Sequence, residues 1–188
     1  IKKYLWVIIL ILLLIICVIG LNEYRKNNIS NNNQRNGDII YNFLTIGDEE
    51  SFKNLKLLAS KNDIESVVPK FILSQRYIEL NDIENAKGIL NSIVSLKNVS
   101  KDLSDLAKIY LFFLENDNLI KEKFLKDLNS PNNSFRLIAL EQKVYILIEN
   151  KEFSEANKLI NLILNDIEVS NSLKQRVKNI QKVISQKL

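Results

Sequence analysis

The sequence lacks histidine and carries a single cysteine among its 188 residues. These shortages exclude imidazole acid–base catalysis, Ser–His and Cys–His nucleophilic sites, Cys/His zinc sites and any intrachain disulfide. Glycine and proline are also scarce, with four and two residues. Turn-rich β-sandwiches and barrels need such residues at close spacing, so the composition argues against them.

Other kinds of site also find no support in the sequence. The four glycines, at 20, 37, 47 and 88, form no phosphate-binding loop. Lysine and arginine total 26 and the acidic residues 22, and the two signs are interspersed. A nucleic-acid surface needs a clustered basic patch, so we expect no nucleic acid partner. We further expect no catalytic residues, no cofactor and no metal, and therefore no enzyme.

An unbroken run without a polar side chain, Leu5 to Leu21, stands near the start of the chain. At about 1.5 Å per residue a helix of this length approaches the thickness of a bilayer. We therefore predict a single-pass transmembrane anchor over 1–21. A cleaved signal peptide ending near Val18-Ile19-Gly20 and a lipoprotein signal at Cys17 are the alternatives.

The residues on either side of the run bear on its orientation. Lys2 and Lys3 precede it, whereas Glu23, Arg25 and Lys26 follow it. Counting positive charges favours a cytoplasmic N-terminus and a C-terminal domain on the other side of the membrane. The chain begins with Ile rather than Met, so we expect a longer or processed gene product.

Residues 22–37 are almost devoid of apolar side chains, which predicts a polar linker. From Asp38 onward apolar residues recur at helical spacing, as in Ala86, Ile89, Leu90 and Ile93. We predict helices over 38–46, 49–60, 66–81, 83–96, 101–115, 118–128, 134–149, 153–166 and 172–186. Ser172 with Gln175 suggests a capping box at the start of the last helix.

An internal repeat is visible in this helical region. Ala86 and Ala156 occupy matching positions in two similar segments. Between these segments, Ala107 repeats Ser74 and Tyr110 repeats Tyr77, each at the same shift along the chain. The two alanines are two repeats apart in this alignment. The period is therefore near 34, the length of a tetratricopeptide repeat (TPR).

The predicted fold class is all-α: a transmembrane helix followed by a TPR-like solenoid of antiparallel helix hairpins over 38–188. Small residues would let the two helices of a repeat approach closely, but Leu119 stands where alanine is expected in the second repeat. The TPR signature Trp, Gly and closing Pro are missing. An irregular helical bundle is the alternative.

The first helices of TPR-like repeats line a concave face that binds peptides. The TPR groove positions map onto the first helix of each predicted repeat, and we predict partner binding at Phe71, Gln75, Ile78, Glu79, Lys101, Ser104, Lys108, Glu141, Tyr145 and Ile148. The mixed polar and apolar character of these residues suits an extended or helical peptide. Part of this set could equally be core or ordinary surface.

Further features can be read along the chain: Tyr41 and Phe43, the stretch from Asp102 to Ala107, and the segment from Asn133 to Leu140 after Pro131. In these features, and in the single apolar span and the polar linker, the chain resembles the YfgM-like bacterial membrane proteins. The resemblance implies an inner-membrane protein with a periplasmic domain. The implied partners are Sec translocon subunits, periplasmic chaperones and nascent exported chains. It also implies kinship with the TPR domain of a cell-division coordinator. A self-associating, structural scaffold without a peptide groove is the alternative function.

Overall fold

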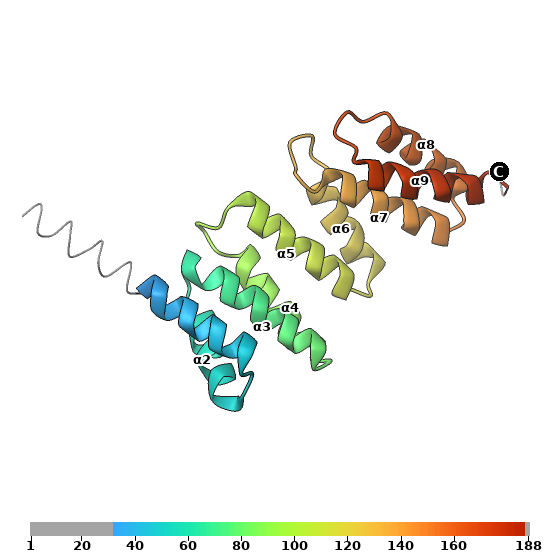
Figure 1. Ribbon diagram of the computed structural model, residues 1–188. Coiled ribbons are helices and arrows are strands. Elements are labelled where there is room, and N and C mark those ends of the chain that lie inside the picture. The colour runs from blue at the N-terminus through green and yellow to red at the C-terminus, as the bar shows by residue number, and fades with distance from the viewer. Residues whose placement is uncertain (1–31, 187–188) are drawn as a thin grey trace, which may run out of the picture. The chain divides into compact units, whose positions relative to one another are not determined.

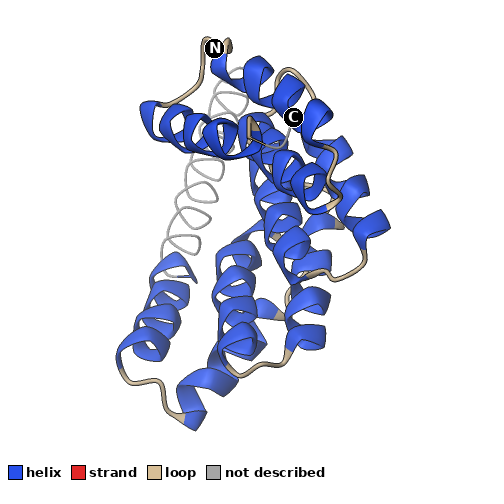
Figure 2. Cartoon of the chain, turned by 90° about the vertical axis from the view of Figure 1, so that its right-hand side faces the viewer, coloured by secondary structure: helices blue, strands red, loops and turns tan. Residues whose placement is uncertain are grey.

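A computed structural model describes residues 32–186 of the chain. All regular structure in this range is helical, and no strand occurs in it (Figure 1, Figure 2). The predicted all-α class is therefore confirmed for the described residues. The chain divides into two compact units, one ending at Lys61 and the other starting at Asn62.

The described part of the first unit is a helical hairpin. A helix covers residues 32–45, beginning earlier than predicted, and α2 follows at Glu49–Ala59. Gly47 between them has φ +65°, a conformation that glycine adopts without steric cost. The Asp48 carboxylate caps α2 by accepting from the backbone N–H of Ser51 at 2.8 Å. The Phe43 and Phe52 rings stack across the hairpin, with 6.0 Å between their centroids.

The second unit begins with a 3₁₀ turn at Ile64–Ser66 and continues with the α-helices α3 to α9. Their bounds are α3 Val67–Glu79, α4 Ile83–Val94, α5 Lys101–Leu114, α6 Asn118–Leu128, α7 Arg136–Glu149, α8 Phe153–Leu164 and α9 Asn171–Ile184. Pro69 lies in the first turn of α3, where its missing N–H is not needed, and Pro131 lies in a loop. Each helix packs on the next one along the chain, because the connections between them are short.

The helix bounds repeat with a constant period, slightly longer than predicted. α3, α5, α7 and α9 end at Glu79, Leu114, Glu149 and Ile184, and subtracting each number from the next gives 35 every time. α4, α6 and α8 begin at Ile83, Asn118 and Phe153 with the same spacing. Three helical hairpins are thus followed by α9, which takes the place of the first helix of a fourth. This arrangement is consistent with an α-solenoid.

The first and third hairpins also share their turn chemistry. Asn81 and Lys151, which are equivalent positions two periods apart, have φ of 57° and 64°, in the left-handed region. In each turn the residue's N–H donates to the carbonyl three residues earlier, and the next N–H donates to the carbonyl five residues earlier. Ser100 and Ser170, also equivalent positions, cap α5 and α9. The cap of α9 is therefore Ser170 and not Ser172, whose hydroxyl instead accepts from Arg176 at 3.0 Å.

Buried aliphatic side chains join the helices of the second unit in three clusters. The first joins α3, α4 and α5 around Leu90 and Ile93, and the second joins α5, α6 and α7 around Leu125 and Leu128. The third and largest joins α7, α8 and α9, with Ile160 fully buried in it. The exposed face of α9 is rich in lysine and glutamine, which suits the end of a stack of helices.

No helix among the described residues is both long and apolar enough to cross a bilayer. The predicted anchor at 1–21 and most of the predicted linker at 22–37 lie outside the described residues.

Candidate functional site

The predicted binding residues of α3 are only partly accessible. Gln75 and Glu79 are exposed, and Glu79 pairs with Arg76 at 3.1 Å on the same helix. Phe71 and Ile78 are half-buried. The Phe71 ring packs on Tyr110 of α5, with 5.9 Å between the ring centroids. This contact shows that α3 and α5 lie side by side where these two rings meet.

The predicted residues of α5 have different surroundings. Lys101 is exposed, Ser104 is half-buried, and Lys108 forms an ion pair with Asp105 at 3.1 Å. Asp105 is buried and also accepts from the side-chain amide of Asn133 at 2.8 Å. The Asn133 amide oxygen accepts in turn from the N–H of Phe135, just before α7. Lys108 and Asp105 therefore belong to a structural link between α5 and the loop before α7.

Among the predicted residues of α7, Glu141 is occupied by an internal partner. Its side chain is buried, at 4% exposure, and its carboxylate accepts two hydrogen bonds from Arg176 of α9, at 2.7 and 2.8 Å. The Glu141 carboxylate raises the pKa of the Arg176 guanidinium through these hydrogen bonds and through its charge. Tyr145 is 39% exposed and Ile148 is half-buried. Glu141 thus holds α9 against α7, and Tyr145 remains accessible.

The observed period brings a different set of residues into register. Gln75 of α3 corresponds to Tyr110 of α5 and Tyr145 of α7, and Ile78 corresponds to Phe113 and Ile148. Tyr110 is 37% exposed and Phe113 is 60% exposed, and Phe is a residue type that is usually buried. We call this set the aromatic stripe: Gln75, Ile78, Tyr110, Phe113, Tyr145 and Ile148.

Tyr110 and Phe113 are absent from the predicted binding residues because the predicted period places α5 in the wrong register. The shorter shift equated Tyr110 with Tyr77 of α3. In the observed register Tyr77 corresponds instead to Phe112, which is buried. Lys101, Ser104 and Lys108 are consequently not equivalent to the predicted residues of α3 and α7. Counting back from the ends of the helices would have found the stripe.

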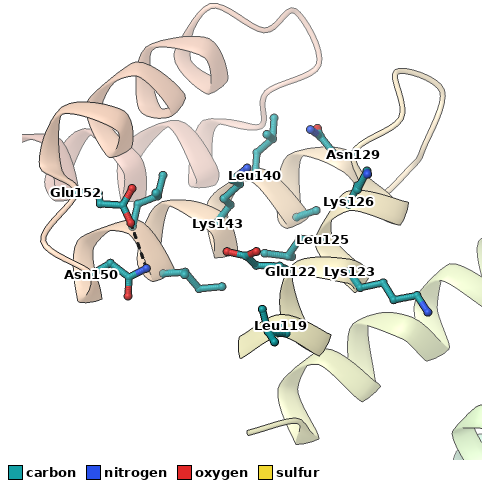
Figure 3. Close-up of a pocket in the computed structure, with 13 residues that line it drawn as sticks. Leu119, Glu122, Lys123, Leu125, Lys126, Asn129, Leu140, Lys143, Asn150 and Glu152 are labelled. Carbon is teal, nitrogen blue, oxygen red and sulfur yellow. Dashed lines mark hydrogen bonds between the residues drawn. The ribbon is translucent and has the colours of Figure 1, made fainter. Parts of the chain in front are cut away.

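A groove of about 780 Å³ lies between α6 and α7 (Figure 3). None of the predicted binding residues lines it. Its apolar lining consists of Leu119, Leu125, Ala139, Leu140, Ile146 and Leu147. Its polar lining consists of Glu122, Lys123, Lys126, Asn129, Lys143, Asn150 and Glu152, and Asn150 donates a hydrogen bond to Glu152 at 3.2 Å.

The sequence of α6 explains why a groove opens beside it. Ala86 in α4 and Ala156 in α8 are fully buried and let these helices approach their neighbours closely. In the observed register the corresponding residue of α6 is Lys121, not Leu119 as the shorter period suggested. The Lys121 ammonium lies 5.7 Å from the centre of the Phe112 ring of α5. A lysine cannot pack in the space of an alanine, and α6 approaches its neighbours less closely than α4 approaches α3 and α5.

The start of α6 is nevertheless firmly fixed. The Asp117 carboxylate caps the helix by accepting from the N–H of Leu119 at 2.8 Å. The Glu115 carboxylate accepts from two backbone N–H groups and from Lys87 of α4, at 3.1 Å for the ion pair. These hydrogen bonds, that of the Asp117 N–H first, lower the pKa of Glu115. The groove therefore has a well-defined end.

In comparisons with known proteins, no family model matches the chain, and neither a curated protein nor a solved structure is significantly similar to it. Within residues 32–186, no group of three or more acidic or cysteine side chains is placed to hold a metal ion. Among the described residues, we consider two candidate binding surfaces: the aromatic stripe and the groove between α6 and α7.

Proposed function

We propose that this chain is a non-enzymatic adaptor that binds segments of other proteins on its helical repeats. The observation that carries the proposal is the aromatic stripe. Aromatic side chains are favoured at protein interfaces because they bury a large area at a small cost in conformational entropy. Tyr110, Phe113 and Tyr145 are held on successive first helices of the repeats, where an extended partner segment could contact all three.

The place of action follows from the sequence. The apolar run from Leu5 to Leu21 would tether the adaptor to a bacterial inner membrane, with the repeats on the periplasmic side. The resemblance to YfgM-like proteins then makes translocon subunits, periplasmic chaperones and emerging exported chains the expected partners. Partly folded exported chains expose apolar segments, which suits an apolar stripe.

In-cell photo-crosslinking tests this proposal. A photo-reactive amino acid is placed at Gln75 on the stripe and, as a matched control, at Lys178 on the exposed face of α9. We expect translocon subunits or chaperones to be captured from Gln75 and not from Lys178. Capture of the chain's own copies from Gln75 would instead support the self-associating scaffold. Capture of cytoplasmic proteins would show that the orientation is the reverse of the proposed one.

A second test separates binding from folding. Tyr145→Ala removes a side chain that is 39% exposed, whereas Val144→Ala truncates a fully buried neighbour on the same helix. We expect Tyr145→Ala to reduce capture from Gln75 with little change in unfolding temperature, and Val144→Ala to lower the unfolding temperature. If Tyr145→Ala leaves capture unchanged, the stripe is not the binding surface.

A further inference from the structure

The two lysines at the edge of the α6–α7 groove, Lys126 and Lys143, are exposed, whereas several half-buried cations of the second unit form ion pairs. Lys87, Lys108 and Arg136 all form ion pairs with carboxylates on the same or neighbouring segments. Lys126 and Lys143, in contrast, have no carboxylate within ion-pair distance among the described residues. Lys126 comes from α6 and Lys143 from α7, so the two unpaired charges lie on opposite walls of the groove.

Between the two lysines the groove has an apolar floor. Leu125, Ala139 and Leu140 are at most 5% exposed and form its base. Leu119 is 79% exposed at one end of the groove. Figure 3 shows that Lys123, which also lines the groove, is directed away from α7, so we assign the positive edge to Lys126 and Lys143.

The side chains that line the groove indicate which class of ligand it would bind. An apolar floor binds aliphatic side chains, and two unpaired ammonium groups above it favour carboxylates. The segment of the same chain that follows the apolar run carries Arg25 and Lys26 against one acid, Glu23, so its charge is unsuitable. Polar and charged side chains line the groove together with apolar ones, which suits a peptide better than a wholly apolar lipid chain.

We propose that the groove between α6 and α7 is a second binding site, for acidic segments with aliphatic side chains on a partner protein. The aliphatic side chains lie on Leu125, Ala139 and Leu140, and the carboxylates pair with Lys126 and Lys143. Two carboxylates also line the groove, Glu122 on the same wall as Lys126 and Glu152 just after α7, and both repel such a segment. This site rests on the proposed adaptor function but is separate from the aromatic stripe.

Lys126 and Lys143 carry the opposite charge to Glu122, so substitutions of these residues should change peptide binding in opposite directions. The full 188-residue chain is reconstituted in lipid nanodiscs, and a random peptide library is selected on it. We expect peptides enriched in Leu or Ile together with Asp or Glu. Lys126→Gln and Lys143→Gln should each weaken their binding by about 1.4- to fivefold, the range measured for exposed ion pairs. Glu122→Gln should strengthen the same binding, because a repulsion is removed.

The matched control is Lys174→Gln with Lys178→Gln on α9, which removes positive charge away from the groove. It should leave binding unchanged, and all variants should keep the circular dichroism of the parent chain. Charge reversal of Lys126 and Lys143 to glutamate should switch the selected peptides from acidic to basic.

The following results would reject the groove site, alone or together with the adaptor function. If acidic peptides are not enriched, or if the α9 control weakens them as much as Lys126→Gln and Lys143→Gln do, the groove is not their site. If the selected peptides are lost with Tyr145→Ala and not with the lysine variants, the adaptor function stands and only the groove site is rejected. If no peptide of any composition is enriched, both proposals fail.

Discussion

Truncation of Ile160 to alanine should destabilise the second unit strongly. Ile160 is fully buried in the cluster that joins α7, α8 and α9, together with Val144, Ile163 and Val177. Removing a buried isoleucine side chain down to alanine costs the transfer free energy of the lost atoms and leaves a cavity, about 3 kcal/mol in total. Each wall of this cavity belongs to a helix that is fixed by its neighbours, so little collapse can reduce the cost.

This free energy predicts a measurable shift in unfolding temperature. The second unit runs from Asn62 to Leu188, and its length sets its entropy of unfolding. With an entropy of unfolding of about 2.1 cal/mol/K per residue, the loss corresponds to a shift of roughly 10 °C. Far-ultraviolet circular dichroism of the full chain in detergent micelles measures the transition.

Leu162→Ala is the matched control, because it makes a similar truncation two residues away on the same helix. Leu162 is 50% exposed, so its truncation should cost less than about 1 kcal/mol. Hydrogen exchange adds a spatial readout: protection should fall most in α7, α8 and α9, because a repeat protein is stabilised mainly by neighbouring repeats. Equal temperature shifts for the two variants would refute the assignment of Ile160 to the core.

Four further substitutions have predictable signs. Lys151→Gly should stabilise the fold by about 1 kcal/mol in urea unfolding, since a lysine with φ of 64° is strained, and Asn81→Gly should gain less because asparagine tolerates this region. Gly88→Ala in α4 should also stabilise by about 1 kcal/mol, because a Cβ there meets no atom within 4 Å. The Arg136 hydrogen bond lowers the pKa of Asp166, so its stabilisation is present above about pH 4 and is lost as pH falls. Asp166→Asn should therefore lower stability at neutral pH and weaken the acid dependence of unfolding; an unchanged acid profile would contradict this reasoning.

The helices could be predicted from the sequence because each carries an apolar stripe of period 3.6 and most have a polar residue at their start. α6 was predicted with its bounds as observed, and α5 and α8 within two residues. The errors at the α9 cap and in the register of α5 have the same origin. Ser170 and Ser172 are equally good capping residues locally, and either Tyr110 or Phe112 can be aligned with Tyr77. Only packing against neighbouring helices decides such cases.

Side-chain contacts between helices of successive repeats could not be predicted from sequence patterns. Glu141 and Arg176 are separated by 35 residues and occupy equivalent positions on α7 and α9. In the first hairpin the same position is Phe71, which packs on an aromatic ring instead. A charged pair thus joins α7 to α9, and an aromatic pair joins α3 to α5. No local sequence pattern relates the two pairs. This is why Glu141 resembled a free binding residue in the sequence.

The divergence of α6 relates to the position of the proposed groove site. α4 and α8 keep the small residue and the buried aliphatic pair that hold a hairpin together, as Leu90 with Ile93 and Ile160 with Ile163 show. α6 keeps the aliphatic pair as Leu125 and Leu128 but replaces the small residue by Lys121. Loss of the whole pattern would have unfolded the hairpin, whereas loss of the small residue alone keeps it folded and leaves a groove. The middle repeat can therefore carry a recognition site because the repeats on both sides, with intact cores, hold it in place.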